Sequence, residues 1–115
     1  MSVIYKIVAR SAWEAAVAQG RFDGASIDLQ DGYIHFSTAA QAQETADKHF
    51  RGQSGLVLVE LPVEAFGEAL KWEPSRGGQL FPHLYIPLDP GLALSVIDIP
   101  LDADGVPQLG LQAPQ

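Results

Sequence analysis

The first third of the chain has the hydrophobic pattern of a strand followed by a helix. Residues 3–9 form a β-rich, partly alternating run, as in a strand with a buried face. An Ala-rich segment follows, in which Ser11 and Glu14 form a capping-box pattern and Gly20 can end the helix. Residues 21–31 carry two Asp-Gly turn signals, and the pattern leaves open whether the segment between them pairs as a strand.

A second strand leads directly into a second helix. Residues 33–37 alternate between apolar and polar side chains, which is the period of a strand. Thr38 and Gln41 then form another capping-box pattern, and residues 39–50 have helical composition and end before a glycine. The sequence therefore predicts a helix that begins where the strand ends.

The second half of the chain has more strands than helices. Residues 55–61 are nearly all apolar, as expected for a central strand that is covered on both faces. The other expected elements are a helical turn at 63–70 and short strands at 71–73, 83–86 and 92–99. Because both main helices lie in the first half, this order predicts an α+β domain with a mostly antiparallel sheet.

Length and composition indicate one domain. The 115 residues are 47% hydrophobic and 18% charged, which suffices for a single core and not for two. From Pro100 onward the pattern decays, and the last dozen residues contain glycines and prolines without periodicity. We expect a folded domain over 1–104 and a loosely held tail over 105–115.

The charge balance and the missing cysteines exclude several kinds of partner and chemistry. Seven Lys and Arg residues stand against fourteen Asp and Glu, which gives a net charge of −7 and argues against a nucleic-acid partner. No apolar stretch approaches the roughly 18 residues of a membrane span, so we expect no membrane partner. The N-terminus has no secretory signal pattern and cysteine is absent, so we expect a cytoplasmic protein without disulfides.

Two of the expected strands carry a histidine and a hydroxyl on one face. In the first, Ile34 and Phe36 point to the core, whereas Tyr33, His35 and Ser37 share the opposite face. The strand after Pro82 repeats the arrangement. There, a buried face of Leu84 and Ile86 alternates with His83 and Tyr85, and the repetition predicts that the two segments build one shared polar site.

The residues beside these histidines suggest an anion site. Ser37 and Thr38 lie at a helix N-terminus, where unpaired N–H groups and a partial positive charge favour a carboxylate or phosphate. Arg76 follows Ser75 and precedes a glycine pair that begins at Gly77, and glycine lets a ligand approach closely. Arg76 would then clamp the anion.

Structural roles remain open for the same residues. Thr38 is also an ordinary N-cap, His35 can bond a backbone carbonyl, and Arg76 can pair with Glu73 on the surface. Trp72 and Phe81 could line a ligand, although aromatic residues in a small domain more often lie in its core.

Two other kinds of site lack their usual spacing. His35 and His83 with a carboxylate could ligate zinc by residue type, but no local two-ligand motif such as H-x-x-x-H is present. Ser37 with His35 as base has no G-x-S-x-G elbow. We therefore assign no metal, and we give no chemistry to His49, which would place a favourable charge at a helix C-terminus.

Three motifs resemble those of a known family. They are I-Y-K-I near the start, D-G-Y-I-H-F-S-T-A-x-Q from Asp31, and W-E-x-S-R-G-G-x-L-F-P-H-L-Y from Trp72. In this order, over residues 3 to about 101, they resemble the small bacterial and plant family called domain of unknown function 952. That family is biochemically uncharacterised and is grouped by fold with the ADP-ribosyltransferase-like proteins.

The resemblance implies split antiparallel sheets around a central cleft that holds NAD. It implies that His35 and Ser37 hold the ribose on the nicotinamide side and that Tyr85 flanks the nicotinamide. Transferases of this fold commonly use a late glutamate as well. After His83 the acidic residues are aspartates, and none lies in a recognisable motif, so binding is better supported than transfer.

We therefore expect an α+β, ADP-ribosyltransferase-like domain whose cleft binds a small anionic metabolite, namely NAD, an ADP-ribose derivative or another nucleotide. Transferase activity is a secondary expectation. The expected catalytic residues are His35, Ser37, Glu73 and His83. The expected cofactor-binding residues are His35, Ser37, Thr38, Ser75, Arg76, Gly77 and Tyr85. The alternative is a noncatalytic structural or protein-interaction module in which both motifs brace the sheet.

Overall fold

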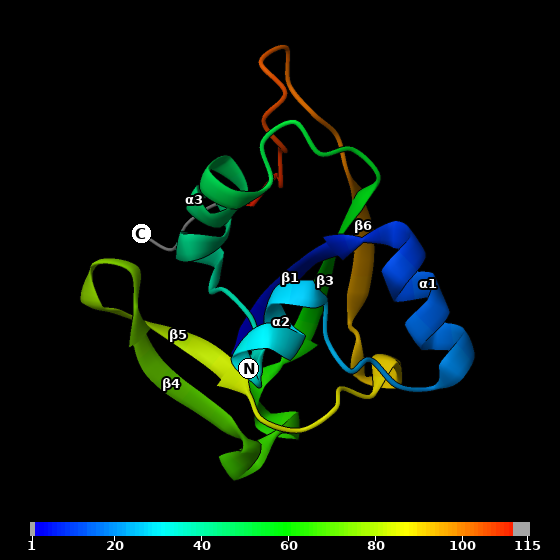
Figure 1. Cartoon of the computed structure of the whole chain (residues 1–115), viewed down its shortest axis with the longest axis vertical. Helices are drawn as coiled ribbons and strands as arrows, with labels where there is room; N and C mark the ends of the chain where they lie inside the picture. The colour runs from blue at the N-terminus through cyan, green and yellow to red at the C-terminus, as the bar shows by residue number, and fades with distance from the viewer. Residues whose placement is uncertain (1, 112–115) are drawn as a thin grey trace.

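Two three-stranded antiparallel sheets form the framework of the molecule (Figure 1). A computed structural model describes residues 2–111, without the side chain of Arg76. The first sheet has the order β1-β3-β6 and the second the order β2-β5-β4. The strands of the first sheet are β1 (Val3–Ala9), β3 (Leu56–Pro62) and β6 (Ser95–Ile99). Those of the second sheet are β2 (Ile34–His35), β5 (Gln79–Leu84) and β4 (Leu70–Ser75).

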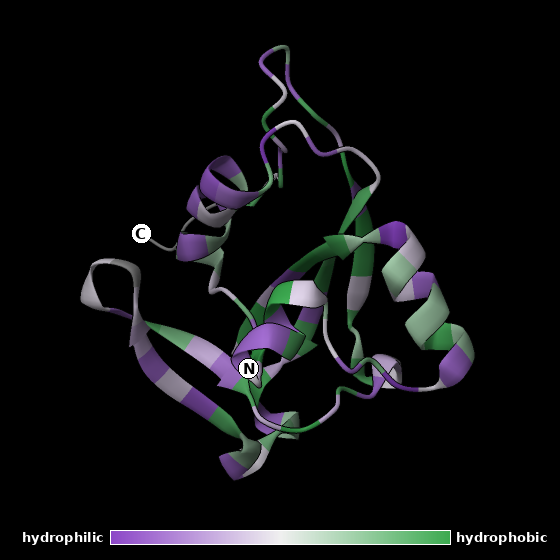
Figure 2. Cartoon of the chain, in the orientation of Figure 1, coloured by the Kyte–Doolittle hydropathy of each residue, from purple (hydrophilic) through white to green (hydrophobic). Residues whose placement is uncertain are grey.

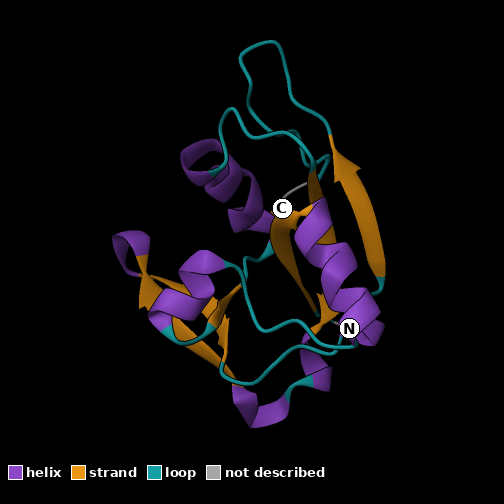
Figure 3. Ribbon diagram, turned by 45° about the vertical axis from the view of Figure 1, so that its right-hand side comes forward, coloured by secondary structure: helices purple, strands orange, loops and turns teal. Residues whose placement is uncertain are grey.

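Three α-helices occupy the connections in the first half of the described chain (Figure 3). They are α1 (Arg10–Gln19), α2 (Ser26–Asp31) and α3 (Ala39–His49). Short 3₁₀ turns follow later, at η1 (Val63–Ala65), η2 (Gly67–Ala69), η3 (Arg76–Gly78) and η4 (Pro90–Leu92). The α+β class with antiparallel sheets is thus confirmed, whereas the expected pair of helices is a set of three.

The first sheet separates two apolar clusters, where a single core was expected, because both faces of this sheet are covered. One face of β1 contributes Ile4 and Val8 to a cluster that also holds Trp13 of α1 and Leu84 of β5. The other face contributes residues to a second cluster, which α3 covers. The central strand β3 is buried on both faces, which confirms the prediction from its apolar run. In Figure 2 the strands of the first sheet are mainly hydrophobic (green), whereas α3 is mainly hydrophilic (purple).

The two capping-box predictions have different outcomes. Thr38 is the N-cap of α3, and its N–H donates to Gln41 Oε1 at 3.1 Å, as predicted. The pattern at Ser11 is wrong as a helix start, because α1 begins at Arg10 with Ala9 as its N-cap. The helix starts earlier because the Arg10 N–H is already held by the carbonyl of Gly55, at 2.7 Å.

Three further expectations can be compared with the structure. The segment left open within residues 21–31 contains α2. Ile86 is not in the core as expected but is 48% exposed, because β5 ends at Leu84 and the alternation ends with it. Trp72 is likewise 43% exposed, whereas Phe81 is buried.

The C-terminal segment is described as far as residue 111. Leu101 and Pro107 form an isolated antiparallel bridge. Leu109 is buried in the cluster under α3. The rest of the expected tail, residues 112–115, lies outside the described residues.

Candidate functional site

The two histidine motifs meet because their strands pair. β2 runs antiparallel to β5, and His35 lies directly opposite His83 in the register. The two imidazole centroids are 5.4 Å apart. Tyr33 packs against both rings, stacked on His83 at 4.2 Å and tilted against His35 at 4.6 Å. The two distant segments therefore lie side by side, as predicted, and bring these side chains together.

Asp28 of α2 joins the site to the first sheet. Its carboxylate is buried and accepts hydrogen bonds from Lys6 Nζ at 3.0 Å and from His35 Nδ1 at 2.7 Å. It also accepts the backbone N–H groups of His35 and Ala25, at 3.0 and 2.7 Å. Burial by itself would raise the pKa of Asp28, but the bonds from His35, Lys6 and Ala25 outweigh it and lower this pKa to about 2.

Lys6 is the buried cation of this group. It lies in the middle of β1, with apolar neighbours on both sides, and only 5% of it is exposed. Burial lowers the pKa of Lys6, and the ion pair with Asp28 partly offsets the effect. The sequence analysis missed both residues. A lysine within an apolar strand was the available signal, because a buried ammonium requires a carboxylate partner.

The second nitrogen of His35 also contacts a carboxylate. Its Nε2 lies 2.9 Å from Oδ2 of Asp31, the last residue of α2. Gly32 follows in the left-handed conformation, with φ at 86°, and turns the chain from α2 toward β2. The ring of His35 is thus held between the carboxylates of Asp28 and Asp31, one at each nitrogen.

His83 belongs to a second hydrogen-bonded group. Its Nδ1 lies 2.8 Å from Glu73 Oε1, and the Tyr85 hydroxyl donates to the same oxygen at 2.7 Å. The bonds from Tyr85 and His83 lower the pKa of Glu73, and the bond to Glu73 raises the pKa of Tyr85 to about 12. A carboxylate that fixes a histidine ring in this way is a common means of orienting a general base.

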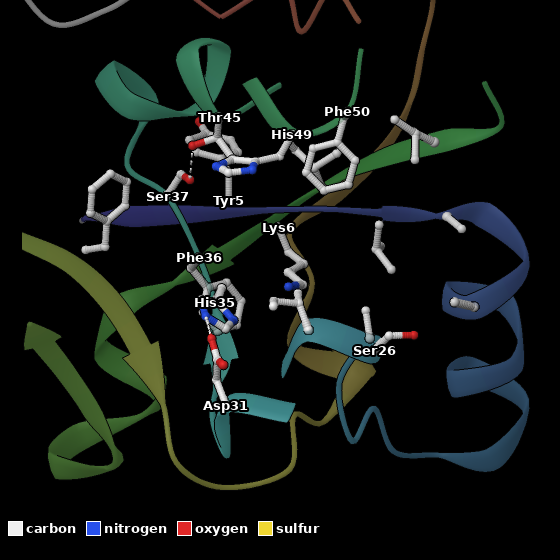
Figure 4. A pocket seen from close by; sticks show the side chains of 18 of the residues that line it. Tyr5, Lys6, Ser26, Asp31, His35, Phe36, Ser37, Thr45, His49 and Phe50 are labelled. Carbon is white, nitrogen blue, oxygen red and sulfur yellow. Dashed lines mark hydrogen bonds and ion pairs between the residues drawn. The ribbon is translucent and has the colours of Figure 1, made fainter. Parts of the chain in front are cut away.

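A cleft of about 790 Å³ runs along β1. Figure 4 shows side chains on both sides of this strand. On the α3 side lie Thr45, His49 and Phe50, and on the α2 side lie Lys6, His35 and Asp31. The cleft is therefore bounded by the first sheet, the end of α3 and the histidine pair.

Four predicted site residues line the cleft, namely His35, Ser37, Ser75 and His83. Ser37 is buried, and its hydroxyl lies 3.1 Å from that of Thr45. This contact satisfies part of its hydrogen-bonding capacity within the protein.

The other predicted residues lie elsewhere. Among the lining residues that the structure describes, Thr38, Glu73, Gly77 and Tyr85 are absent. Glu73 contacts His83, and the Tyr85 hydroxyl donates to Glu73. Thr38 caps α3, and Gly77 lies in the turn between β4 and β5. The side chain of Arg76 is outside the described residues.

His49 is a lining residue to which the sequence analysis assigned no chemistry. It is the last residue of α3 and borders the cleft together with Phe50. The position of His49 follows from the packing of α3 on the first sheet. A helical sequence pattern alone does not predict which residues at the end of a helix border a cleft.

Neither a metal cluster nor a membrane span is found in the described part of the chain. Within residues 2–111, no group of three or more His, Cys, Asp or Glu side chains is arranged to hold a metal ion. No described helix combines the length and the apolar character needed to cross a bilayer.

Comparisons with known proteins identify one family and several similar structures. The family model described as "Protein of unknown function (DUF952)" matches residues 7–96. A crystal structure of protein CC0527 from Caulobacter crescentus is 59% identical, with a TM-score of 0.92 over 95% of this chain and 96% of that chain. A solution NMR structure of CC0527 has the same identity and a TM-score of 0.86, over 96% of this chain and 95% of that chain. No curated protein matches the chain.

Proposed function

The chain belongs to the DUF952 family, and we propose that its cleft binds a nucleotide-like metabolite, with NAD and ADP-ribose as the first candidates. The observation that carries the proposal is the pair of imidazoles, His35 and His83, on the wall of one cleft. Carboxylates hold both rings, His35 at its two nitrogens and His83 at Nδ1, so the wall of the cleft and the second nitrogen of His83 are oriented before a ligand arrives. Such preorganisation lowers the entropy lost on binding.

The size of the cleft and its aromatic residues suit a nucleoside. A volume of about 790 Å³ falls within the range of roughly 300–1,000 Å³ that small-molecule sites occupy. Tyr5, Phe50 and Phe81 line it, and aromatic side chains pack against planar rings with offset or tilted geometry. The cleft therefore offers contacts to a base or nicotinamide ring.

The carboxylates favour the ribose end of such a ligand. Asp31 lines the cleft and uses Oδ2 for His35, and acidic side chains accept hydrogen bonds from ribose hydroxyls in other dinucleotide sites. We therefore place the ribose hydroxyls beside Asp31.

Transferase activity is the more specific part of the proposal. With Nδ1–H donated to Glu73, the other nitrogen of a neutral His83 carries a lone pair and can accept a proton. His83 also lines the cleft. We propose that His83 takes the proton of an attacking hydroxyl while the hydroxyl oxygen bonds the anomeric carbon of the NAD ribose and nicotinamide leaves. The role of Glu73 is to orient the ring.

Calorimetric titration with NAD, ADP-ribose and AMP tests the binding proposal. We expect at least one of these ligands to bind the wild type. His83→Gln and Asp31→Asn should each lower the affinity for that ligand about tenfold. Asp98→Asn is the matched control, because Asp98 pairs with Arg10 on the surface and does not line the cleft. Unchanged affinity in both cleft variants, or no binding to the wild type, would contradict the proposal.

One observation favours a noncatalytic module as the second candidate. Asp28 accepts four hydrogen bonds within the protein, and both ring nitrogens of His35 are engaged, as expected of a brace between α2 and the sheets. Thermal melts separate the candidates, since a ligand that binds the folded state raises Tm. Strong destabilisation by His35→Ala together with no metabolite-induced rise in Tm supports the module.

A further inference from the structure

The outer edge of β1 carries backbone groups that point away from the first sheet. β1 is the edge strand of the order β1-β3-β6. On that outer side, the Tyr5 N–H donates to the Ser37 carbonyl at 2.8 Å, and the Ser37 N–H donates to the Tyr5 carbonyl at 2.9 Å. In an antiparallel ladder, the backbone groups of alternate residues face the same side. The N–H and C=O of Ile7 and the N–H of Ala9 therefore face outward as well.

A second hydrogen bond gives the same alternation from the other end of the strand. The Arg10 N–H donates to the Gly55 carbonyl just beyond β3. The N–H of Arg10 thus points toward the side of β3, whereas the N–H of its neighbour Ala9 points outward, like that of Tyr5. Within residues 2–111, no hydrogen bond engages the three outward groups of Ile7 and Ala9.

The ladder on this edge begins and then stops. The bridge between Tyr5 and Ser37 is its single rung in the described chain. The next rung would pair Ile7 with His35, but β2 turns away to join β5. The His35 N–H donates to Asp28 Oδ1 instead. The two sheets diverge at this point, and the unpaired part of β1 becomes a floor of the cleft, which Ile7, Val8 and Ala9 line.

We infer that this edge binds an extended peptide segment of another protein by strand addition. Outward residues two positions apart repeat about every 7 Å, which is the spacing of donors and acceptors along an extended main chain. An added strand pairs with the N–H and C=O of Ile7 and with the N–H of Ala9. The rung at Ser37 shows that the edge already accepts a strand in this geometry.

The walls beside this edge determine the side chains of the peptide. On the side of β1 where α1 and α2 lie, the cleft is lined by Ala12, Ala25 and Ile27. At the end of α3 it is lined by Phe50. Ile27 is 51% exposed. Alternate side chains of an added strand point to opposite walls, so the partner segment carries uncharged, mainly apolar or small residues. This inference does not depend on the proposed metabolite.

Ala9→Pro removes one donor without disturbing the backbone. Ala9 has φ at −60° and ψ at 136°, which proline adopts without strain. Its N–H makes no bond to β3, so the sheet keeps its ladder. Ala9→Ser is the matched control, because it retains the N–H and serine is a favoured N-cap. Both variants are expected to fold.

The probe is a pooled library of acetylated and amidated tetrapeptides made from valine, isoleucine, threonine and serine. We expect at least one member to slow hydrogen exchange at the Ile7 amide and to bind Ala9→Pro about fivefold more weakly than Ala9→Ser. If no member slows exchange at Ile7, or if the two variants bind the peptide equally, the inference is wrong.

A parallel titration keeps this inference separate from the proposed function. His83→Gln is expected to weaken the binding of NAD or ADP-ribose about tenfold and that of the peptide much less, because the peptide pairs with backbone groups of Ile7 and Ala9 that the substitution leaves in place. Protection of Ile7 by a metabolite and by no peptide would overturn the inference and leave the proposed function standing. Peptide binding without metabolite binding would support the inference and contradict the proposed function.

Discussion

Replacing Asp28 by asparagine is the perturbation with the largest expected effect on stability. The change keeps the shape of the side chain and removes its charge. Lys6 then remains buried, with 5% exposure, and loses its partner at 2.9 Å. The amide also turns one acceptor into a donor, so it cannot accept all four of the hydrogen bonds that converge on Asp28.

Two independent arguments give the magnitude. Removing one partner of a buried ion pair costs about 3–5 kcal/mol. The pKa of Asp28, lowered from 3.8 to about 2, corresponds to about 2.5 kcal/mol of stability at neutral pH. We therefore expect Asp28→Asn to lower the free energy of unfolding by about 2.5–5 kcal/mol, which is a large part of the 5–15 kcal/mol typical of a domain.

The pH dependence of the difference identifies its source. A carboxyl group whose pKa is lowered in the folded state stabilises the protein above its unfolded pKa and loses this contribution as the pH falls toward the folded pKa. The difference between wild type and Asp28→Asn should therefore shrink as the pH falls from about 5 to about 2. Urea denaturation at several pH values measures it, with Asp98→Asn as the surface control.

Two results would refute this reasoning. One is a difference of less than about 1 kcal/mol at neutral pH, comparable to that of a surface ion pair. The other is a difference that does not change with pH, because the contribution of a group with a lowered pKa has to disappear on protonation.

Three further predictions concern the core, the second carboxylate and the strand edge. Leu84→Ala should lower the free energy of unfolding by about 2–5 kcal/mol in chemical denaturation, and Ile86→Ala should lower it by less than about 0.5 kcal/mol. Equal losses would contradict the buried position of Leu84 and the exposed position of Ile86. Glu73→Gln should lower the pKa of Tyr85 from about 12 toward its usual value in a tyrosinate absorbance titration, and an unchanged titration would exclude the bond. The Ile7 amide should exchange with solvent faster than those of its two neighbours in β1, and slow exchange there would show that the outer edge is paired.

Local patterns predicted much of what brings the histidines together. Alternation along 33–37 and after Pro82 placed His35 and His83 on the polar faces of two strands, and the structure pairs these strands. Thr38 and Gln41 were recognised as the start of α3. Such features depend on side-chain period and on contacts three residues apart, which a sequence displays directly.

The features that sequence reasoning missed depend on tertiary contacts. Asp28 is buried because it neutralises Lys6, which lies 22 positions earlier in the chain. No short-range repeat in the sequence predicts that pair. Ile86 continued an alternation that the structure ends with β5. The position of His49 beside the cleft likewise follows from how α3 packs on the sheet.

The most direct test of the account is whether both imidazoles respond to one ligand. Long-range ¹H–¹⁵N spectra resolve the ring nitrogens of His35 and His83 during titration with ADP-ribose and NAD. We expect the signals of both rings to shift together, with a common dissociation constant. If neither ring responds at millimolar ligand, or if only one ring responds, the result would contradict a shared binding cleft.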